Sequence, residues 1–550
     1  MKLFFYGEKM HQIVNIKTEN RFALACLEII RKIESCEITH SNIEFGKIQI
    51  AKKYLLPKIP KNAEIINYAD REDPSFSLVN RMLKIKPVRT LSGVANISVM
   101  WLDKDHRSPH NPDRFYSCPA ACVYCAQGSL KNGVMLPAPK SYTGCEPTTM
   151  RAIRNDYDPW KQVKNRLKQL HIIGHATGKC ELIIMGGTFT SMPPEYQDNF
   201  VKRCFDAFNA EESSALEEAQ IKNETARNRC IGLTIETRAD FCRQQHVSQM
   251  LRLGCTRVEI GVQSTSDKIL AAIKRGHDAK ENTKAIKLLK DSGLKFTAHW
   301  MPGLTGLTGG IDEDLEIELF KQLFTDSNYK PDELKIYPVL VLPGTELYEM
   351  WQRGEYKPLT REQMLRLLIE MKKTVPKYVR IKRIMRDISE HESAAGASTT
   401  NLRQLAKIEM EKTGISCKCI RCREIGLSSK QPKSADLAVY EYEASGGREF
   451  FISYEDAEQG ILLGFLRLRI SNNQAFVREL HVYGEMTPIG EASKQVQHRG
   501  MGKNLLTKAE EIAASFGVSK ILVTSGVGVR SYYRKLGYVF ENPYMVKNLV

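Results

Sequence analysis

Between residues 91 and 385, short apolar segments alternate with helix-like segments, and this pattern constrains the fold more than any other feature. The strand candidates cover residues 93–101, 180–187, 230–238, 257–264, 294–303 and 333–342. Short apolar strands separated by helices predict a parallel sheet, and a long series of such units predicts a full or partial (β/α) barrel. Ligands in such folds bind where the strands end, and several candidates end in polar or Gly-rich tips, MGGT, ETR, GVQS and MPG.

A cysteine cluster with the spacing CxxxCxxC, formed by Cys118, Cys122 and Cys125, follows the first predicted strand. Three thiolates on one loop can ligate three irons of a 4Fe–4S cluster and leave the fourth iron open to a substrate. Zinc stays an alternative, because Cys145 and His110 lie near enough in the sequence to supply a fourth ligand.

This spacing, together with the predicted barrel, resembles the radical S-adenosylmethionine (SAM) superfamily. The resemblance implies that the open iron binds SAM and that one electron cleaves it to a 5′-deoxyadenosyl radical. Gly186 and Gly187 form a strand tip where backbone can approach SAM without a Cβ, or else a plain tight turn. Glu236, Arg238 and Gln263 at later strand ends suit ribose hydroxyls and a carboxylate, although each also suits a structural network.

A second cysteine cluster, Cys417, Cys419 and Cys422 with the spacing CxCxxC, lies between the two large parts of the chain. Tetrahedral zinc needs a fourth ligand, for which we nominate His391, the nearest upstream histidine. A structural zinc here would fix the linker, and a second Fe–S cluster is the alternative.

Residues 436–550 change to hairpin-like strands and contain the loop QHRGMG (497–502) directly before a helix. Backbone N–H groups at such a helix start can bind a pyrophosphate. With the following KILVTS and YYRKLGY segments, this order resembles the GNAT acetyltransferases. The resemblance implies that acetyl-CoA lies on the loop with Tyr532 or Tyr533 near its thioester, whereas two tyrosines of the core or surface are the alternative.

The chain is strongly basic, with 80 Lys and Arg against 64 Asp and Glu and a formal net charge of +16. Such an excess favours a polyanionic partner, nucleic acid first, unless the source proteome is Lys-rich throughout. The 14 cysteines without an export signal indicate a reducing, cytoplasmic compartment. No apolar window approaches 18 residues, so we expect no transmembrane helix.

The two parts together resemble one family, the catalytic subunit of Elongator, which carboxymethylates the wobble uridine of tRNA. The matching segments include KPVRTLSGVA (86–95), MGGTFTSMPPEY (185–196), GCTRVEIGVQS (254–264), RGH (275–277) and SGVGVRSYYRKLGY (525–538). The sequence departs from the family at Ala126-Gln127-Gly128, where Pro-Gly-Gly is usual. It also departs at Ala239, where Pro is usual, and at Trp300, where Met is usual.

The family resemblance implies a reaction in which a radical formed on the acetyl methyl of acetyl-CoA adds to C5 of the wobble uridine. Thioester hydrolysis then leaves 5-carboxymethyluridine. The acetyl-CoA contacts implied by the motifs are Lys179, Glu479, Leu480, His481, Val482, Met501, Gly502, Lys503 and Tyr533. The implied catalytic candidates are Tyr533, Tyr532 and, at the predicted radical site, Lys335.

We therefore expect an α/β protein with a partial (β/α) TIM-like radical SAM barrel and a C-terminal GNAT α/β domain. The predicted divisions are a helical, basic tRNA-binding region (1–85), the radical SAM domain (86–385), a zinc-type linker (386–435) and the GNAT domain (436–550). The expected partners are the tRNA anticodon stem-loop and acetyl-CoA, with self-association or accessory subunits. Two alternatives are a protein lysine acetyltransferase with a structural barrel and a tRNA-binding scaffold without turnover.

Overall fold

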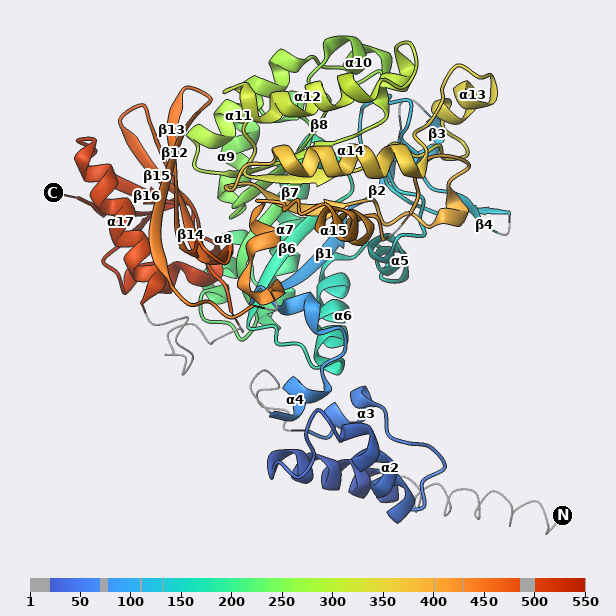
Figure 1. The fold of residues 1–550 in the computed structure, drawn as a ribbon, viewed down its shortest axis with the longest axis vertical. Helices are drawn as coiled ribbons and strands as arrows, with labels where there is room; N and C mark the ends of the chain where they lie inside the picture. Colours follow the sequence, from blue (N-terminus) through green and yellow to red (C-terminus); the bar gives the residue numbers. More distant parts are fainter. Residues whose placement is uncertain are drawn as a thin grey trace.

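The computed structural model describes residues 20–69, 78–108, 111–131, 133–399, 401–428, 430–484 and 500–549. A small helical body, a central parallel sheet wrapped by helices and a C-terminal sheet follow one another along the chain (Figure 1). Among these residues no helix is both long and apolar enough to cross a membrane.

The central sheet has the strand order β1-β6-β7-β8-β9-β10-β11, and every neighbouring pair is parallel. Its strands are β1 Ala95–Met100, β6 Lys179–Met185, β7 Arg229–Thr237, β8 Arg257–Gln263, β9 Lys295–Trp300, β10 Glu333–Ile336 and β11 Arg380–Ile384. The sheet ends at β1 and β11 and is a half-barrel, which confirms the predicted partial barrel.

Helices cover the outer face of this sheet, because each carries one apolar stripe that must be buried. They are α5 Pro147–Arg154, α6 Pro159–Ile172, α7 Pro194–Asn209, α8 Leu216–Asn223, α9 Gln244–Arg252, α10 Asp267–Ala272, α11 Ala279–Asp291, α12 Glu313–Thr325, α13 Glu346–Gln352 and α14 Arg361–Thr374. Helix α7 starts with Pro194 in its first turn and buries Phe200, Phe205 and Phe208. The side chain of Asp278 caps α11 by accepting from the Glu281 N–H.

Short elements complete the central part and lead into the linker. They are the hairpins β2 Asp103–Ser108 with β3 Asn111–Tyr116 and β4 Leu130–Lys131 with β5 Val134–Met135, helices α15 Leu402–Lys412 and α16 Ile420–Arg423, and the 3₁₀ turns η1 Pro87–Thr90, η2 Phe189–Ser191, η3 Ala239–Phe241, η4 Leu304–Leu307, η5 Glu390–Glu392 and η6 Ile425–Leu427.

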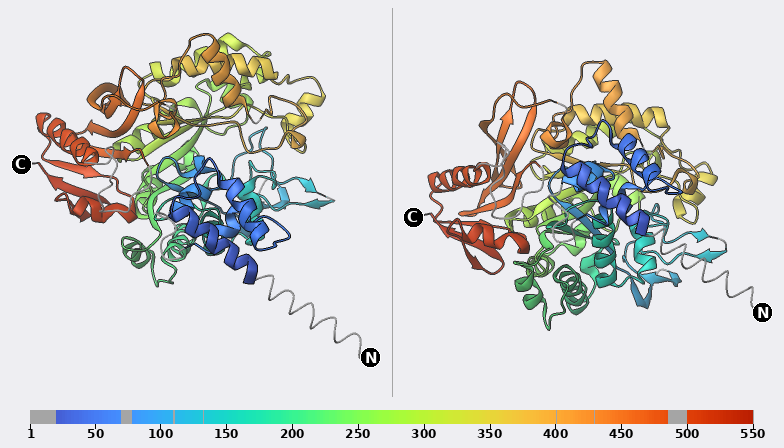
Figure 2. Two further views of the ribbon diagram at one scale, coloured as in Figure 1. Left: turned by 60° about the horizontal axis from the view of Figure 1, so that its bottom comes forward. Right: turned by 90° about the horizontal axis from the view of Figure 1, so that it is seen from below.

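The N-terminal body contains a helix over residues 20–34, α2 Ile43–Lys53, α3 Asn62–Ile66 and α4 Leu78–Leu83. Its own core includes Ile29, Ile33, Ile50 and Ile65. The body lies beside the central domain next to α6, which α3 contacts (Figure 2).

The C-terminal sheet has the order β12-β13-β14-β15-β16-β18-β17. Its elements are β12 Asp436–Ala444, β13 Gly447–Asp456, β14 Ile461–Ser471, β15 Gln474–Val482, α17 Met501–Ser515, β16 Lys520–Val523, η8 Val527–Val529, α18 Arg530–Arg534, β17 Val539–Glu541 and β18 Tyr544–Asn548. Only β15 and β16 run parallel, and they pair over just three residues, from Ala475 to Val477. Strand β15 continues to Val482, so within the described chain its residues after Val477 have no strand partner on the β16 side.

The C-terminal domain packs against the N-terminal ends of the central strands through buried charges. Arg478 donates from its two terminal nitrogens to Asp332 at 2.6 Å each, and Nη2 also reaches Glu449 at 2.6 Å. Arg469 and Lys290 contact the same Glu449 at 3.0 and 3.4 Å. We call these five residues the interface cluster; each side chain is at most 1% exposed.

Candidate active site

A cavity of about 140 Å³ opens at the C-terminal ends of the central strands, where the sequence predicts the ligand site. The polar and sulfur-bearing residues that line it include Cys118, Cys122, Cys125, Gly187, Glu236, Arg238, Gln263, Arg275, His299, Tyr337 and Arg386. The cavity therefore brings together the first cysteine cluster and the three strand-end residues predicted to contact SAM.

The three cysteines of the first cluster lie among polar partners that suit thiolates. Thr188 contacts the sulfur of Cys118 at 3.0 Å, Ser141 contacts that of Cys125 at 2.9 Å, and Arg275 donates to Cys122 at 3.5 Å. A hydrogen bond from Cys125, with the charge of Arg275, holds the pKa of Cys122 well below its usual value. The deprotonated sulfur is the form that ligates metal.

Arg275 is a site residue that reasoning from side-chain chemistry missed. It is 5% exposed, and its Nη2 donates to the Gly261 carbonyl at 2.6 Å, which fixes the guanidinium beside Cys122. The RGH segment in the family comparison was the available signal, but nothing local in the sequence links it to the cysteine loop.

Gly186 and Gly187 adopt φ angles of +127° and +91°, which L side chains rarely adopt. A Cβ added at Gly186 would lie 2.9 Å from Trp101, and one at Gly187 would lie 3.5 Å from the Cβ of Cys118. Gly187 lines the cavity, whereas Gly186 supports the turn against Trp101.

Five lining residues carry buried polar atoms that lack a hydrogen-bond partner among the residues the structure describes: Tyr124 Oη, Arg238 Nη1, Glu259 Oε1, Gln263 Oε1 and Arg275 Nε. Arg238 Nη1 and Gln263 Oε1 belong to residues predicted to contact SAM. The other guanidinium nitrogens of Arg238 hold Asp240 at 2.8 and 2.9 Å. Orphaned polar atoms are costly unless a ligand or water satisfies them. A donor and an acceptor beside a three-cysteine loop fit the amino acid and ribose groups of SAM.

Glu236, Glu259 and His299 present their ligand atoms within 4.8 Å of one another at the cavity floor. Lys335 already supplies the cation between the carboxylates, since its Nζ contacts Glu259 and lies 3.6 Å from Glu236. Burial lowers the pKa of Lys335, but the charge of Glu259 outweighs burial and the net pKa lies above its usual value. Lys335 is therefore an ammonium group at neutral pH.

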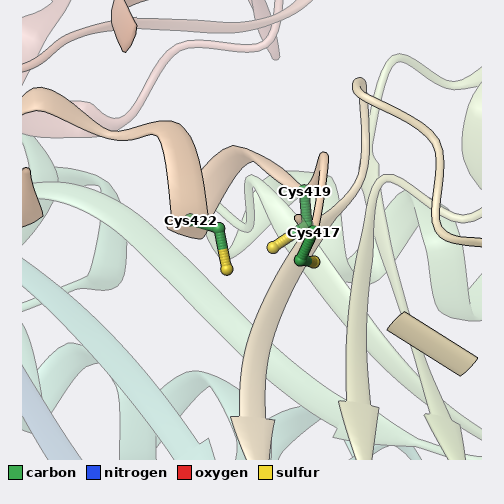
Figure 3. Close-up of side chains that lie close together, drawn as sticks. All are labelled: Cys417, Cys419 and Cys422. Atoms are coloured by element: carbon green, nitrogen blue, oxygen red, sulfur yellow. The ribbon is translucent and has the colours of Figure 1, made fainter. Parts of the chain in front are cut away.

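The second cluster brings the sulfurs of Cys417, Cys419 and Cys422 within 4.8 Å of one another (Figure 3). These three thiols could hold a metal ion. The ammonium of Lys372, 3% exposed, lies 3.6 Å from the sulfur of Cys422. A buried cation whose hydrogen-bond partner is sulfur fits thiolates rather than neutral thiols.

His391 does not join the second cluster, and no fourth His, Cys, Asp or Glu does so within the described ranges. It is exposed in η5, where its neighbour Glu392 accepts from Thr143 at 3.0 Å, beside the loop of the first cluster. This position gives no support to His391 as the fourth ligand.

The acetyl-CoA candidates on α17 lie at a helix start after Gly500, whose φ is +81°. Met501, Gly502 and Lys503 form the first turn, and the predicted Gln497 lies outside the described residues. A Cβ on Gly502 would lie 3.0 Å from the Tyr532 hydroxyl, so Tyr532 stands beside this turn.

Tyr533 points instead into the core of the C-terminal domain. It is 6% exposed, with its ring 5.8 Å from that of Tyr538. Burial raises the pKa of both Tyr532 and Tyr533. Both hydroxyls are therefore protonated donors at neutral pH, and Tyr532 is the one beside the predicted pyrophosphate loop.

The candidates on β15 lie on its free end, facing the central domain. Glu479 accepts from Arg467 at 2.9 Å and lies 3.5 Å from Lys295, the first residue of β9. His481 contacts the Ser92 carbonyl at 3.1 Å. Leu480 and Val482 pack at the edge of the C-terminal core.

Lys179 begins β6 and pairs in register with Arg229. Burial, and then the charge of Arg229, lower the pKa of Lys179. A Cβ on Gly528 would lie 2.6 Å from the Cβ of Arg229, so Lys179 lies at the end of the half-barrel on which the C-terminal domain packs. The cavity and the acetyl-CoA candidates thus occupy opposite ends of the same strands.

Four family models match successive parts of the chain. The chain matches the ELP3 N-terminal domain over residues 22–91, the radical SAM superfamily over 114–316, the radical SAM C-terminal domain over 331–412 and the acetyltransferase (GNAT) family over 420–538.

Two curated relatives span nearly the whole chain. The tRNA uridine(34) acetyltransferase of Methanocaldococcus jannaschii is 47% identical over 508 residues, which are 89% of this chain and 90% of the relative. Elongator complex protein 3 of Schizosaccharomyces pombe is 40% identical over 544 residues, 96% of this chain and 98% of the relative.

Among solved structures, the archaeal Methanocaldococcus infernus Elp3 lacking residues 1–46 matches with a TM-score of 0.70 and 43% identity. The match covers 84% of this chain and all of that one. The predicted resemblance is confirmed: the chain belongs to the Elongator complex protein 3 family, with a radical SAM half-barrel and a GNAT domain in one polypeptide.

Proposed function

We propose that this protein is a tRNA uridine(34) acetyltransferase that forms 5-carboxymethyluridine at the wobble position from acetyl-CoA by radical SAM chemistry. One observation carries the proposal: a three-cysteine cavity with orphaned polar atoms and a GNAT-type loop lie at the two ends of one set of strands. The near full-length relative named for this activity supports it.

Cys118, Cys122 and Cys125 would hold the 4Fe–4S cluster, which when bound supplies the electron that cleaves SAM. Arg238 and Gln263 would bind polar groups of SAM with their unpaired atoms. Arg275 donates to the sulfur of Cys122, and Gly187 leaves room beside Cys118.

At the floor of the cavity, the Lys335 ammonium neutralises Glu236 and Glu259 and orients both carboxylates. The Lys335 ammonium can also donate a hydrogen bond to the carbonyl oxygen of an acyl group that reaches the cavity floor. We infer this role for Lys335 in place of general base catalysis, because its pKa lies above the usual value.

The first turn of α17 would bind the pyrophosphate of acetyl-CoA through its free N–H groups, since helix N-termini attract anions. Tyr532 stands beside this turn, and its hydroxyl would donate a hydrogen bond to the bound acetyl-CoA there. Lys179, Glu479 and His481 lie where the two domains meet, and they would contact the rest of the acetyl-CoA molecule.

The predicted tRNA-binding region is the N-terminal body, together with the overall charge of +16. Lys52, Lys53, Lys58 and Lys61 are exposed there, near the exposed ring of Phe45. Lysines that contact phosphates give salt-dependent affinity for any nucleic acid, and exposed aromatic rings can stack on bases.

The finer parts of the proposal are zinc at Cys417, Cys419 and Cys422, a cytoplasmic location and association with itself or accessory subunits. Zinc is favoured over iron because the spacing provides three clustered thiols on one short segment, as in structural zinc sites. Metal analysis of protein purified without oxygen tests the assignment: one zinc per chain that Cys417→Ala removes.

The test of the function is mass spectrometry of tRNA incubated with the reduced protein, SAM and acetyl-CoA. We expect 5-carboxymethyluridine with the wild type, none with Cys118→Ala, and normal amounts with Cys36→Ala, which changes an exposed cysteine outside both clusters. Acetylated lysine peptides without modified tRNA would instead support the lysine acetyltransferase alternative, which the relatives do not favour.

A further inference from the structure

The short segment 275–277 between α10 and α11 lies against two walls of the cavity at once. Arg275 donates to the sulfur of Cys122 at 3.5 Å. Gly276, whose φ is +80°, lies against Arg238, because a Cβ added there would be 3.1 Å from Nη2 of that arginine. The backbone of this segment therefore borders both the first cysteine loop and the arginine predicted to contact SAM.

Asp240, in η3, fixes the guanidinium of Arg238. Nε of Arg238 donates to Oδ1 of Asp240 at 2.9 Å, and Nη2 donates to Oδ2 at 2.8 Å. Two parallel bonds set the plane of the guanidinium as well as its position. Nη1 stays out of this pair: it is buried and has no hydrogen-bond partner in the described ranges, although Arg238 lines the cavity. One donor is therefore held in a fixed direction and left for a ligand.

His277 contacts the same carboxylate. Its Nδ1 lies 3.4 Å from Oδ1 of Asp240, and its Nε2 lies 3.2 Å from Oδ1 of Asn282 near the start of α11. The side chain of His277 is 2% exposed and Asn282 is fully buried, so packing holds both in place. Burial would raise the pKa of Asp240, but contacts with His277 and Arg238 outweigh it and hold that pKa well below its usual value. Asp240 is therefore a carboxylate at neutral pH, the form that accepts both bonds from Arg238.

The surface of the protein carries a pair of the same geometry, which shows how Arg238 differs. Arg353 binds Glu355, also two residues further on, through Nε at 2.7 Å and Nη2 at 2.8 Å. Those side chains are 54% and 49% exposed, so water can satisfy the remaining nitrogen. The side chains of Arg238 and Asp240 are only 6% and 21% exposed. A pair that only stabilised η3 would gain nothing from a buried, unbonded donor beside a cavity, because such a donor costs free energy until something accepts from it.

We propose that Asp240 and His277 are positioning residues for SAM. Asp240 orients Arg238 so that Nη1 donates to an oxygen of SAM, either of its carboxylate or of its ribose. His277 holds Asp240 in the place that this orientation requires. Both residues act through Arg238. This inference rests on the proposed function and adds the residues that set the affinity of the cavity for SAM.

The first test measures SAM binding by calorimetry on the iron-loaded protein without reductant, so that no SAM is cleaved. Asp240→Asn keeps the size of the side chain but removes its charge and one of the two acceptors for Arg238. We expect SAM to bind about tenfold more weakly, as for the loss of one charge-assisted hydrogen bond, while iron content and acetyl-CoA affinity stay at the wild-type level. Glu355→Gln is the matched control, because it makes the same change in the surface pair and should leave SAM affinity unchanged.

A second probe identifies the oxygen that Nη1 of Arg238 meets. 5′-Methylthioadenosine keeps the ribose of SAM and lacks its carboxylate. If Asp240→Asn weakens the binding of SAM alone, Nη1 donates to the carboxylate; if it weakens the binding of both probes, Nη1 donates to the ribose.

A double-mutant cycle separates positioning from a structural role of the turn. Arg238→Gln removes the donor itself, so Asp240→Asn added to it should weaken SAM binding no further. His277 is tested by a matched pair of variants. His277→Ala should lower SAM affinity severalfold, and His277→Asn, whose amide can still donate to Asp240, should restore most of it. The His277 variants also carry the test if Asp240→Asn does not fold.

Two results would overturn the positioning role. Wild-type SAM affinity in both Asp240→Asn and His277→Ala would show that neither residue positions Arg238 and that water satisfies Nη1. Additive weakening in the cycle, or loss of iron together with SAM affinity, would show a structural role for the turn instead. The proposed function fails separately: a wild-type protein that binds SAM but modifies no uridine contradicts the function and leaves the positioning of Arg238 intact.

Discussion

The interface cluster and a second group of paired charges lie near the same ends of the central strands but differ in their access to solvent. The second group is Glu181, Arg257, Glu333 and Lys382, which we call the lumen cluster. Within the interface cluster, Arg478 uses both terminal nitrogens on two carboxylates, and no side chain is more than 1% exposed. Within the lumen cluster, the side chains of Glu181 and Lys382 are 17% and 19% exposed, and Arg257 Nε forms a long ion pair with Glu259 at 4.0 Å. The first cluster is closed to solvent, although Arg478 Nε has no hydrogen-bond partner among the described residues, whereas solvent reaches part of the second cluster.

The comparison shows that one molecule holds buried charges in two settings, one closed to solvent and one that solvent partly reaches. A sealed ion network adds little net stability compared with apolar packing, but removing one member leaves a buried charge uncompensated. Ion pairs that solvent reaches contribute less, because water screens the charges that remain. Removing a member of the interface cluster should therefore cost more stability than removing a member of the lumen cluster.

The largest expected effect is that of Asp332→Ala in the interface cluster. Asp332 is fully buried and accepts from both terminal nitrogens of Arg478, so its loss leaves that guanidinium with one carboxylate, Glu449, and the Leu294 carbonyl. We expect the free energy of unfolding to fall by about 3–5 kcal/mol in urea denaturation. Glu355→Ala, which breaks an exposed pair with Arg353, should leave the free energy of unfolding nearly unchanged, because solvent screens exposed pairs. Equal costs for the two variants would show that the interface cluster is not sealed.

A smaller effect is expected from Gly526→Ala, which tests whether packing also closes the interface at η8. A Cβ at Gly526 would overlap the backbone carbonyl of Ile231 on β7, so the two domains would have to separate locally. We expect a loss of about 1–3 kcal/mol and increased hydrogen exchange in β7. Gly178→Ala is the control, because its Cβ would be 3.8 Å from its nearest neighbour; a stability as high as this control's would contradict the close packing.

Much of the fold and of the cavity could be predicted from the sequence, because local patterns carry them. Strand and helix periods gave the half-barrel, and the spacing of Cys118, Cys122 and Cys125 placed the site at the strand ends. The departure at Trp300 leaves the cavity intact, since the indole packs in the core against Phe320, with 5.7 Å between ring centroids.

The remaining features depend on contacts between distant strands, which a pattern along one strand does not reveal. Strand β8 places Arg257 and Glu259 on one face, but their partners come from strands elsewhere in the chain. Tyr532 and Tyr533 are adjacent, yet a helix turns by about 100° per residue, so only the packed helix decides which hydroxyl meets the loop. Proximity in sequence predicts His391 as a ligand of the second cluster, but its neighbour Glu392 contacts Thr143, near the loop of the first cluster.

The smallest expected effect is a difference in the pH ranges over which the two clusters change stability. Burial, assisted by the charge of Arg257, lowers the pKa of Lys382 to about 7, against the favourable charges of Glu333 and Glu259. The unfolded chain therefore binds more protons than the folded one between about pH 7 and pH 10.5, and the free energy of unfolding rises with pH over that range. Because solvent still reaches the side chain, we expect a rise of only about 1 kcal/mol.

Lys382→Met should remove this alkaline rise, which urea titrations at pH 7 and pH 9 would detect as a flatter profile than that of the wild type. The interface cluster changes the free energy of unfolding at acid pH instead. Burial would raise the pKa of Asp332, but Arg478 and Lys290 outweigh it and hold that pKa well below its usual value. Its stabilisation is present above about pH 4 and is lost as the pH falls further, so Lys382→Met should leave the acid limb unchanged. If Lys382→Met also changed stability at acid pH, the two clusters would behave as one network, and the distinction between them would be wrong.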